Sequence, residues 1–167
     1  DLYKESDIKL PDQNIFPESA PNLANHKWGE LRRYKGIPKI GPIDHEMSKT
    51  LIHAYYASVS YVDAQIGKLL NALDDFGLRD STIVVLVGDH GWSLSEHGLW
   101  AKHSNFEVAL HVPMIISAPN FPVNVKTNSI AELVDIYPTL CELTIGSKPK
   151  HLQGISLVSS MRNPEKI

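Results

Sequence analysis

A carboxylate and an imidazole stand side by side directly after a run of apolar residues. Asp89 and His90 follow Gly88, and the six residues before that glycine, 82–87 (TIVVLV), are all apolar or β-branched. Such a run is typical of a buried strand. Ligands in open α/β sheets bind beyond the carboxyl ends of strands, so this pair is well placed to meet one.

Asp89 and His90 could supply two ligands to a divalent cation. Carboxylate oxygens suit calcium or magnesium, and an imidazole widens the choice toward zinc or manganese. Two donors complete none of these sites, since even zinc takes three or four. Glu96, His97 and His103 on the following loop are further candidates. An alternative is equally open, in which Asp89 caps the turn and His90 is a hydrogen-bonded histidine at the core's rim.

A lysine follows the pair by a dozen residues. Lys102 lies between Trp100 and Phe106 on the same loop. If the loop returns to the crevice, the amine would be a compact positive charge for an anionic oxygen. The alternative is a solvated surface lysine.

A long helix over 44–76 is the main element that must position this loop. Asp44 is a suitable N-cap and Gly77 a suitable stop. The helix would be about 50 Å long, whereas a compact domain of this length is about 40 Å across. We therefore expect either a kink near Gly67 or packing on a larger sheet whose other strands lie outside the chain. The apolar stripe comprises Leu51, Tyr55, Val62, Ile66, Leu69, Leu73 and Phe76.

A second apolar run, residues 112–118, predicts another buried strand. Two such strands joined by a long connection fit a parallel or mixed sheet covered on both faces. A further helix is predicted from Asp135, with Pro138 in its first turn and Gly146 at its end. An earlier start, capped by Ser129 with Glu132, would place the proline inside the helix and is disfavoured.

Cys141 is the single cysteine. It lies within this second helix and is expected to be a buried structural residue.

Residues 1–43 are predicted to be an irregular arm, and residues 44–167 to form the domain proper. Five of the eleven prolines lie in this arm, which prevents long helices. Its middle carries Trp28 with Lys27, Arg32, Arg33 and Lys35. The arm is either a surface segment held by its aromatic residues or a substrate-facing loop for an anionic ligand.

The bulk composition excludes several classes of function. The chain has 167 residues and a net charge of -3, which gives no support to a nucleic-acid or anionic-membrane partner. No apolar run approaches a membrane span. One cysteine cannot form an intrachain disulfide, so cysteine usage leaves the compartment unknown.

The segment GDHGWSLSEHGLWAKHSNFEVALHVPMII resembles the second metal-binding segment of sulfatases in the alkaline phosphatase superfamily, closest to the iduronate-2-sulfatase group. The 44–76 helix and ELVDIYPTLCELTIG resemble the same family, so the likeness covers roughly residues 44–157. It implies part of a mixed, mostly parallel α/β sheet between helices. By resemblance the protein would be periplasmic, secreted or lysosomal.

The resemblance also implies roles for individual residues. Asp89 and His90 would bind calcium, and Lys102 would bind oxygens of a sulfate ester. Trp92 and His103 would contact the substrate, a sulfated glycan or another sulfate ester. His103 stands where iduronate-2-sulfatase-like sequences often have tyrosine, which leaves the substrate's details open.

The family's nucleophile motif, Cys/Ser-x-Pro-x-Arg, whose first residue becomes formylglycine, does not occur in the 167 residues. The aspartate pair that completes the calcium site is also missing. We therefore expect a fragment from the latter part of a catalytic domain, inactive without the N-terminal half. Two alternatives stay open: a phosphonate or phosphate ester hydrolase of the same superfamily, and a non-catalytic remnant that serves as a binding or structural module.

Overall fold

The computed structural model describes residues 2–12, 15–25 and 29–165, which divide into two compact units. The first unit comprises Asp1–Gly77 and His90–Pro113, and the second comprises Leu78–Asp89 and Met114–Ile167. The peptide bond between Asp89 and His90 is thus one of the points where the chain passes from one unit to the other. Among the described residues, no helix combines the length and apolar character that a membrane crossing requires.

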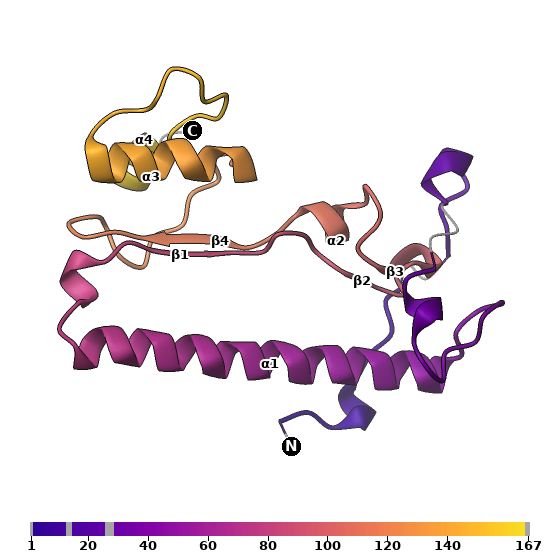
Figure 1. Cartoon of the computed structure of the whole chain (residues 1–167). Coiled ribbons are helices and arrows are strands. Elements are labelled where there is room, and N and C mark those ends of the chain that lie inside the picture. The colour runs from indigo at the N-terminus through magenta and orange to yellow at the C-terminus, as the bar shows by residue number, and fades with distance from the viewer. Residues whose placement is uncertain (1, 13–14, 26–28, 166–167) are drawn as a thin grey trace. The chain divides into compact units, whose positions relative to one another are not determined.

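The first unit is built on α1, a helix over His45–Asp75 (Figure 1). Asp44 caps it, because its carboxylate accepts a hydrogen bond of 2.8 Å from the Met47 N–H. Gly77 ends it with a positive φ of 65°, a conformation that glycine adopts without strain. The predicted start and stop are confirmed. The expected kink near Gly67 is wrong, since α1 is one continuous helix.

The apolar stripe of α1 is only partly covered. Leu51, Tyr55, Ile66 and Leu73 are half-buried, whereas Val62, Leu69 and Phe76 are 54%, 69% and 78% exposed. The two buried residues of the helix, Ser48 and Ile52, lie outside the stripe, so none of the stripe residues is fully buried against the described chain. The alternative reading of the helix length, a larger sheet with strands outside this chain, stays a prediction.

Short elements complete the first unit. The arm contains three 3-10 helices, at Glu5–Asp7, Asn22–Ala24 and Leu31–Arg33. Farther along, β2 (Ser93–Leu94) and β3 (Trp100–Ala101) form an antiparallel pair around the 3-10 helix Glu96–Gly98, and α2 spans Glu107–Leu110.

The arm's basic residues serve partly to fold the arm itself. The Arg32 guanidinium donates to the carbonyl oxygens of Pro38 and Gly41, at 2.9 and 2.6 Å. Lys27 and Trp28, which the sequence also singles out, lie outside the described residues.

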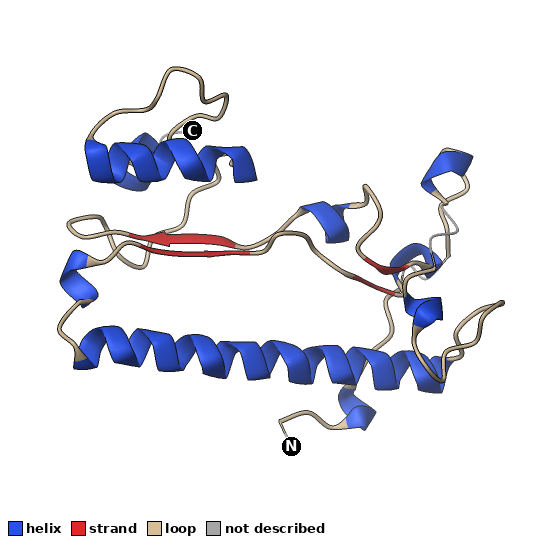
Figure 2. Cartoon of the chain, viewed as in Figure 1, coloured by secondary structure: helices blue, strands red, loops and turns tan. Residues whose placement is uncertain are grey.

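The second unit contains the two predicted strands (Figure 2). Their predicted burial is not seen within the described chain, because neither strand has a buried residue and Leu86 and Ile115 are 38% and 57% exposed. β1 (Val84–Val87) pairs with β4 (Met114–Ser117), with Val84 opposite Ser117. The pair is antiparallel, and the described residues contain no parallel pair, so the two strands do not form the purely parallel sheet that the sequence left open. The 3-10 helices Arg79–Ser81 and Leu133–Asp135 and the helices α3 (Ile136–Ile145) and α4 (Val158–Arg162) complete this unit.

The start of α3 differs in detail from the prediction. The helix begins after Asp135 and ends at Gly146, as expected, but the Asp135 carboxylate does not cap it. Instead it accepts hydrogen bonds from the N–H groups of Glu132 and Ile155, at 2.9 and 2.7 Å. The carboxylate therefore attaches the segment after α3 to the start of this helix.

Thr139 reinforces that attachment. Its side chain is fully buried, donates to the Asp135 carbonyl at 2.6 Å and accepts from the Leu157 N–H at 2.8 Å. Cys141, two residues later, is buried and has a free thiol, as expected. The polar residues Asp135 and Thr139 thus have structural roles in the second unit.

Candidate functional site

Gly91 fixes the start of the loop over residues 91–106, which carries most of the candidate site residues. Its N–H donates to the Ala109 carbonyl at 2.9 Å, and the next N–H, that of Trp92, donates to the Val108 carbonyl at 3.0 Å. A Cβ atom on Gly91 would lie 2.0 Å from the Val108 oxygen. The backbones approach so closely that glycine is required here, which sets the positions of the residues on either side, His90 and Trp92.

The His90 ring is oriented by its own backbone. Its Nδ1 lies 2.8 Å from the Gly91 carbonyl oxygen. A carbonyl can only accept, so Nδ1 carries the proton, and in the neutral ring Nε2 is the nitrogen with the lone pair. Metal-binding histidines commonly have this tautomer, in which one ring nitrogen donates to a carbonyl and the other carries the lone pair.

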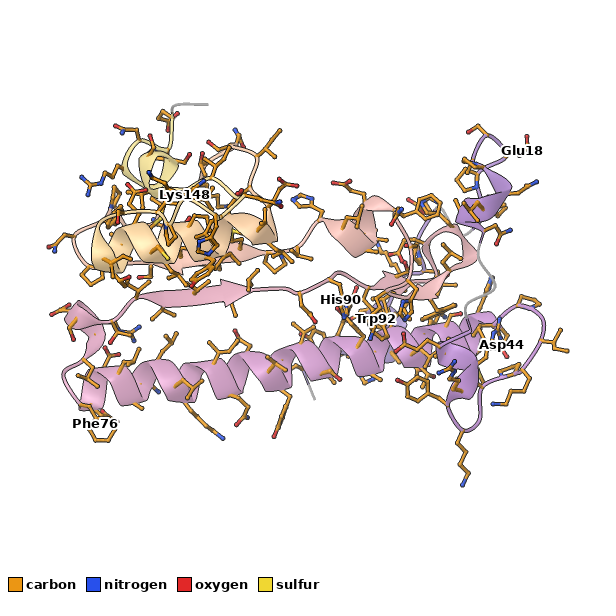
Figure 3. All side chains as sticks on the ribbon, turned by 45° about the horizontal axis from the view of Figure 1, so that its top comes forward. Glu18, Asp44, Phe76, His90, Trp92 and Lys148 are labelled. Atoms are coloured by element: carbon orange, nitrogen blue, oxygen red, sulfur yellow. The ribbon has the colours of Figure 1, made fainter. Side chains whose placement is uncertain are left out.

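Trp92 lies between an aromatic ring and a cation. Its ring stacks with that of Tyr55 from α1, at a centroid distance of 6.2 Å and an interplanar angle of 26°. The Lys102 Nζ lies 5.4 Å from its ring centroid, within the range of a cation–π interaction. The His90 ring lies 6.1 Å from the same indole, and Figure 3 shows the two residues beside each other. Trp92 therefore connects the histidine to the lysine.

Lys102 and His103 share a carboxylate partner. Lys102 Nζ lies 3.4 Å from Oε1 of Glu30, and His103 Nε2 lies 3.1 Å from its Oε2. Glu30 belongs to the arm, 72 residues earlier than Lys102. The arm and the loop thus meet at this carboxylate.

A cavity of about 610 Å³ lies next to these two basic residues. The arm contributes apolar residues to its lining, and the loop contributes both polar and apolar residues. Its lining comprises Pro21, Leu23, Ala24, Lys102, His103, Ser104, Asn105 and Phe106. A ligand there would meet a cationic amine and an imidazole on one side and aliphatic carbon on the other.

The loop before Lys102 has an unusual backbone. Ser95, His97 and Ala101 have positive φ angles of 87°, 56° and 72°, a conformation that costs non-glycine residues energy. The Glu96 carboxylate accepts a hydrogen bond from the Leu94 N–H, and the His97 ring packs on that of Phe106 at 4.3 Å. Glu96 and His97 therefore support the loop.

The described part of the chain contains no group of three or more His, Cys, Asp or Glu residues suited to hold a metal. Glu96, His97 and His103, the further ligand candidates from the sequence, therefore do not assemble into such a group there.

The structure brings four of the five predicted site residues together in the first unit: His90, Trp92, Lys102 and His103. The fifth, Asp89, is the last residue of the second unit's first segment and is joined to His90 by the peptide bond.

Two residues that contact the site, Tyr55 and Glu30, were not predicted from the sequence to do so. The signal for Glu30 was weak but present: it is the one acidic residue among the basic ones of residues 27–35.

The sulfatase family model matches residues 8–147. The chain is 42% identical over 124 residues to iduronate 2-sulfatase of Homo sapiens, an alignment that covers 71% of this chain and 22% of that protein. A solved structure described in complex with D-glucosamine-2-N,6-O-disulfate matches with a TM-score of 0.67 and 33% identity, covering 71% of this chain and 24% of that one.

A phosphonate monoester hydrolase from Silicibacter pomeroyi matches with a TM-score of 0.72 and 30% identity, covering 78% of this chain and 26% of that one. The predicted fold class, part of a mixed α/β sheet of the alkaline phosphatase-like type, is confirmed by these structures. The chain spans about a quarter of the length of the proteins it matches. It belongs to the sulfatase family.

Proposed function

We propose that this chain forms one side of the active site of a sulfuric ester hydrolase, similar to iduronate 2-sulfatase, that acts on sulfated glycans. The observation that carries the proposal is the grouping of Lys102 and His103 at a cavity, with the Lys102 amine over Trp92. The 42% identity to iduronate 2-sulfatase supports the substrate class.

Lys102 has the chemistry to bind the anionic end of such a substrate. Its side chain is 32% exposed, so its amine is held by protein contacts yet accessible. A fixed positive charge favours the negative charge that develops on the ester oxygens during cleavage. His103 lines the same cavity and would contact the sugar or its sulfate. Trp92 supports the amine from its ring face, and its flat apolar surface suits a sugar ring.

Asp89 and His90 are proposed to bind a divalent cation, with calcium as the expected ion. The donors fit this purpose in part, because Asp89 supplies hard oxygens and the His90 ring leaves Nε2 as its lone-pair nitrogen. Calcium takes six to eight ligands, so most ligands would come from residues beyond these 167. When bound, the ion supplies positive charge that offsets charge on the sulfuryl oxygens.

The nucleophile is proposed to come from outside this chain. A formylglycine requires a Cys/Ser-x-Pro-x-Arg motif, and the 167 residues contain none. The single cysteine, Cys141, is buried in α3. The 167 residues alone should therefore hydrolyse no aryl sulfate, and measurable turnover by the purified chain would contradict this.

A second candidate function is hydrolysis of phosphonate or phosphate esters. The observation that favours it is the TM-score of 0.72 with a phosphonate monoester hydrolase. A third possibility is a non-catalytic remnant that acts as a binding or structural module. A Cys/Ser-x-Pro-x-Arg motif in the codons upstream of Asp1 would support a hydrolase, whereas a stop codon or unrelated sequence would support the remnant.

The test compares kcat/KM of the protein from the complete coding sequence on matched aryl sulfate and phenylphosphonate esters. The proposal predicts a clear preference for the sulfate and loss of turnover on chelation, restored by calcium. Preference for the phosphonate would favour the second candidate. Absence of turnover on either ester would favour the remnant.

A further inference from the structure

We infer that Glu30 is a positioning residue that holds Lys102 and His103 together at the cavity. The inference rests on the proposed function, because it gives those two residues the task of binding the anionic group. The proposed function assigns no role to Glu30 itself. Its role follows from three separate features of the structure.

The first feature is the two-sided contact. Each oxygen of the Glu30 carboxylate faces a different partner. Oε1 accepts a hydrogen bond of 3.4 Å from the Lys102 amine, and Oε2 lies 3.1 Å from the His103 ring nitrogen without a hydrogen bond. The two partners are neighbours in the chain, and consecutive side chains usually diverge. A single carboxylate that lies close to both therefore restrains their separation.

The second feature is that the Glu30 side chain is less exposed than those of its two partners. The Glu30 side chain is 19% exposed, whereas those of Lys102 and His103 are 32% and 44% exposed. Both basic residues line the cavity, and Glu30 does not. The carboxylate thus holds its partners from the protein side and leaves their other faces open to a ligand. It supports an anion-binding pair and does not occupy the place of the anion.

The third feature is the backbone that precedes the pair. Ala101, directly before Lys102, has a φ of 72°, which is unfavourable for a residue with a Cβ. Such a conformation persists only when surrounding contacts determine it. The Glu30 contacts come from a segment 72 residues away and supply a tertiary restraint of this kind.

Loss of the carboxylate should therefore loosen the pair and leave the fold intact. Lys102 would keep its contact with Trp92 but regain much of the rotational freedom of a long side chain. A catalytic group displaced by about 1 Å can cost about a hundredfold in rate. We expect Glu30→Gln to lower kcat/KM on a sulfate ester by about 10- to 100-fold.

The experiment uses the protein from the complete coding sequence, in a double-mutant cycle. Glu30→Gln is made in the wild-type background and in a Lys102→Ala, His103→Gln background. If Glu30 acts through the pair, the 10- to 100-fold loss shrinks to less than about twofold in the second background. An equal loss in both backgrounds would show a general structural role and overturn the inference.

Two further variants complete the design. Glu107→Gln is the matched control, because Glu107 also contacts a histidine, His111 at 3.4 Å, but is 84% exposed; it should leave kcat/KM unchanged. Glu30→Asp keeps the charge and shortens the side chain, so it should recover part of the loss. Full wild-type kcat/KM in Glu30→Gln would also overturn the inference.

Binding of inorganic sulfate separates this inference from the proposed function. If the wild-type protein hydrolyses no sulfate ester, the proposed function falls, but calorimetric titration with sulfate still tests Glu30. The inference predicts that Glu30→Gln binds sulfate at least about fivefold more weakly than the wild type. Equal affinities, or no sulfate binding by the wild type, would overturn it.

Discussion

Replacement of Gly91 by alanine should destabilise the protein strongly. The new Cβ would lie 2.0 Å from the Val108 carbonyl oxygen, whereas ordinary contact begins at 3.4 Å. The two backbones would have to separate by about 1.4 Å, which is enough to break the hydrogen bonds that Gly91 and Trp92 donate to Ala109 and Val108. With about 1 kcal/mol for each bond and more for polar groups left unpaired, we expect a loss of about 2–4 kcal/mol.

Urea unfolding of the protein from the complete coding sequence, followed by tryptophan fluorescence, would measure this loss. Gly67→Ala is the matched control. Gly67 lies within α1, and a Cβ there would meet nothing within 4 Å, so the substitution should be neutral or stabilising by about 0.5–1 kcal/mol. If Gly91→Ala changed the free energy of unfolding no more than Gly67→Ala does, the close approach at Gly91 would be refuted.

Two further substitutions test the elements around the site. Thr139→Val should cost about 1–3 kcal/mol in the same unfolding assay, because it leaves the part-buried Leu157 N–H without its acceptor. Thr144→Val, at an exposed position, should cost less than about 0.5 kcal/mol, and equal costs would contradict this account. Asp44→Ala should lower the free energy of unfolding by about 1 kcal/mol through loss of the α1 cap. Asp44→Asn should lower it much less, and a similar loss in both variants would argue against capping.

Local signals were sufficient to predict the two longest helices, α1 and α3, but not α4 or the 3-10 helices. Asp44 and Gly77 bound α1 because capping and left-handed glycine depend on residues close in sequence. The same holds for Gly146 at the end of α3. The sequence did not predict that Asp135 would attach to residue 155, because that contact joins segments 20 residues apart.

The site residues were recognisable by type, but their contacts were not. Asp89, His90 and Lys102 stood out through their chemistry and position after a strand. Glu30 did not, because nothing local indicates that an acidic residue in the arm reaches a loop 72 residues later. The exposed residues of the α1 stripe, Val62, Leu69 and Phe76, show the same limit, since helical periodicity indicates which residues share a face and not what covers it.

The most direct test of the central claim is the activity of the complete protein with Lys102→Ala, compared with Lys49→Ala. Lys49 also contacts a carboxylate, Glu46 at 3.5 Å, and at 34% its side chain is about as exposed as that of Lys102, but it lies on α1 and does not line the cavity. If Lys102 binds the reacting sulfate, its loss should lower kcat/KM on a sulfate ester by about 100- to 1000-fold, while Lys49→Ala should change it less than twofold. Comparable activity in the two variants would contradict the assignment of this loop to the active site.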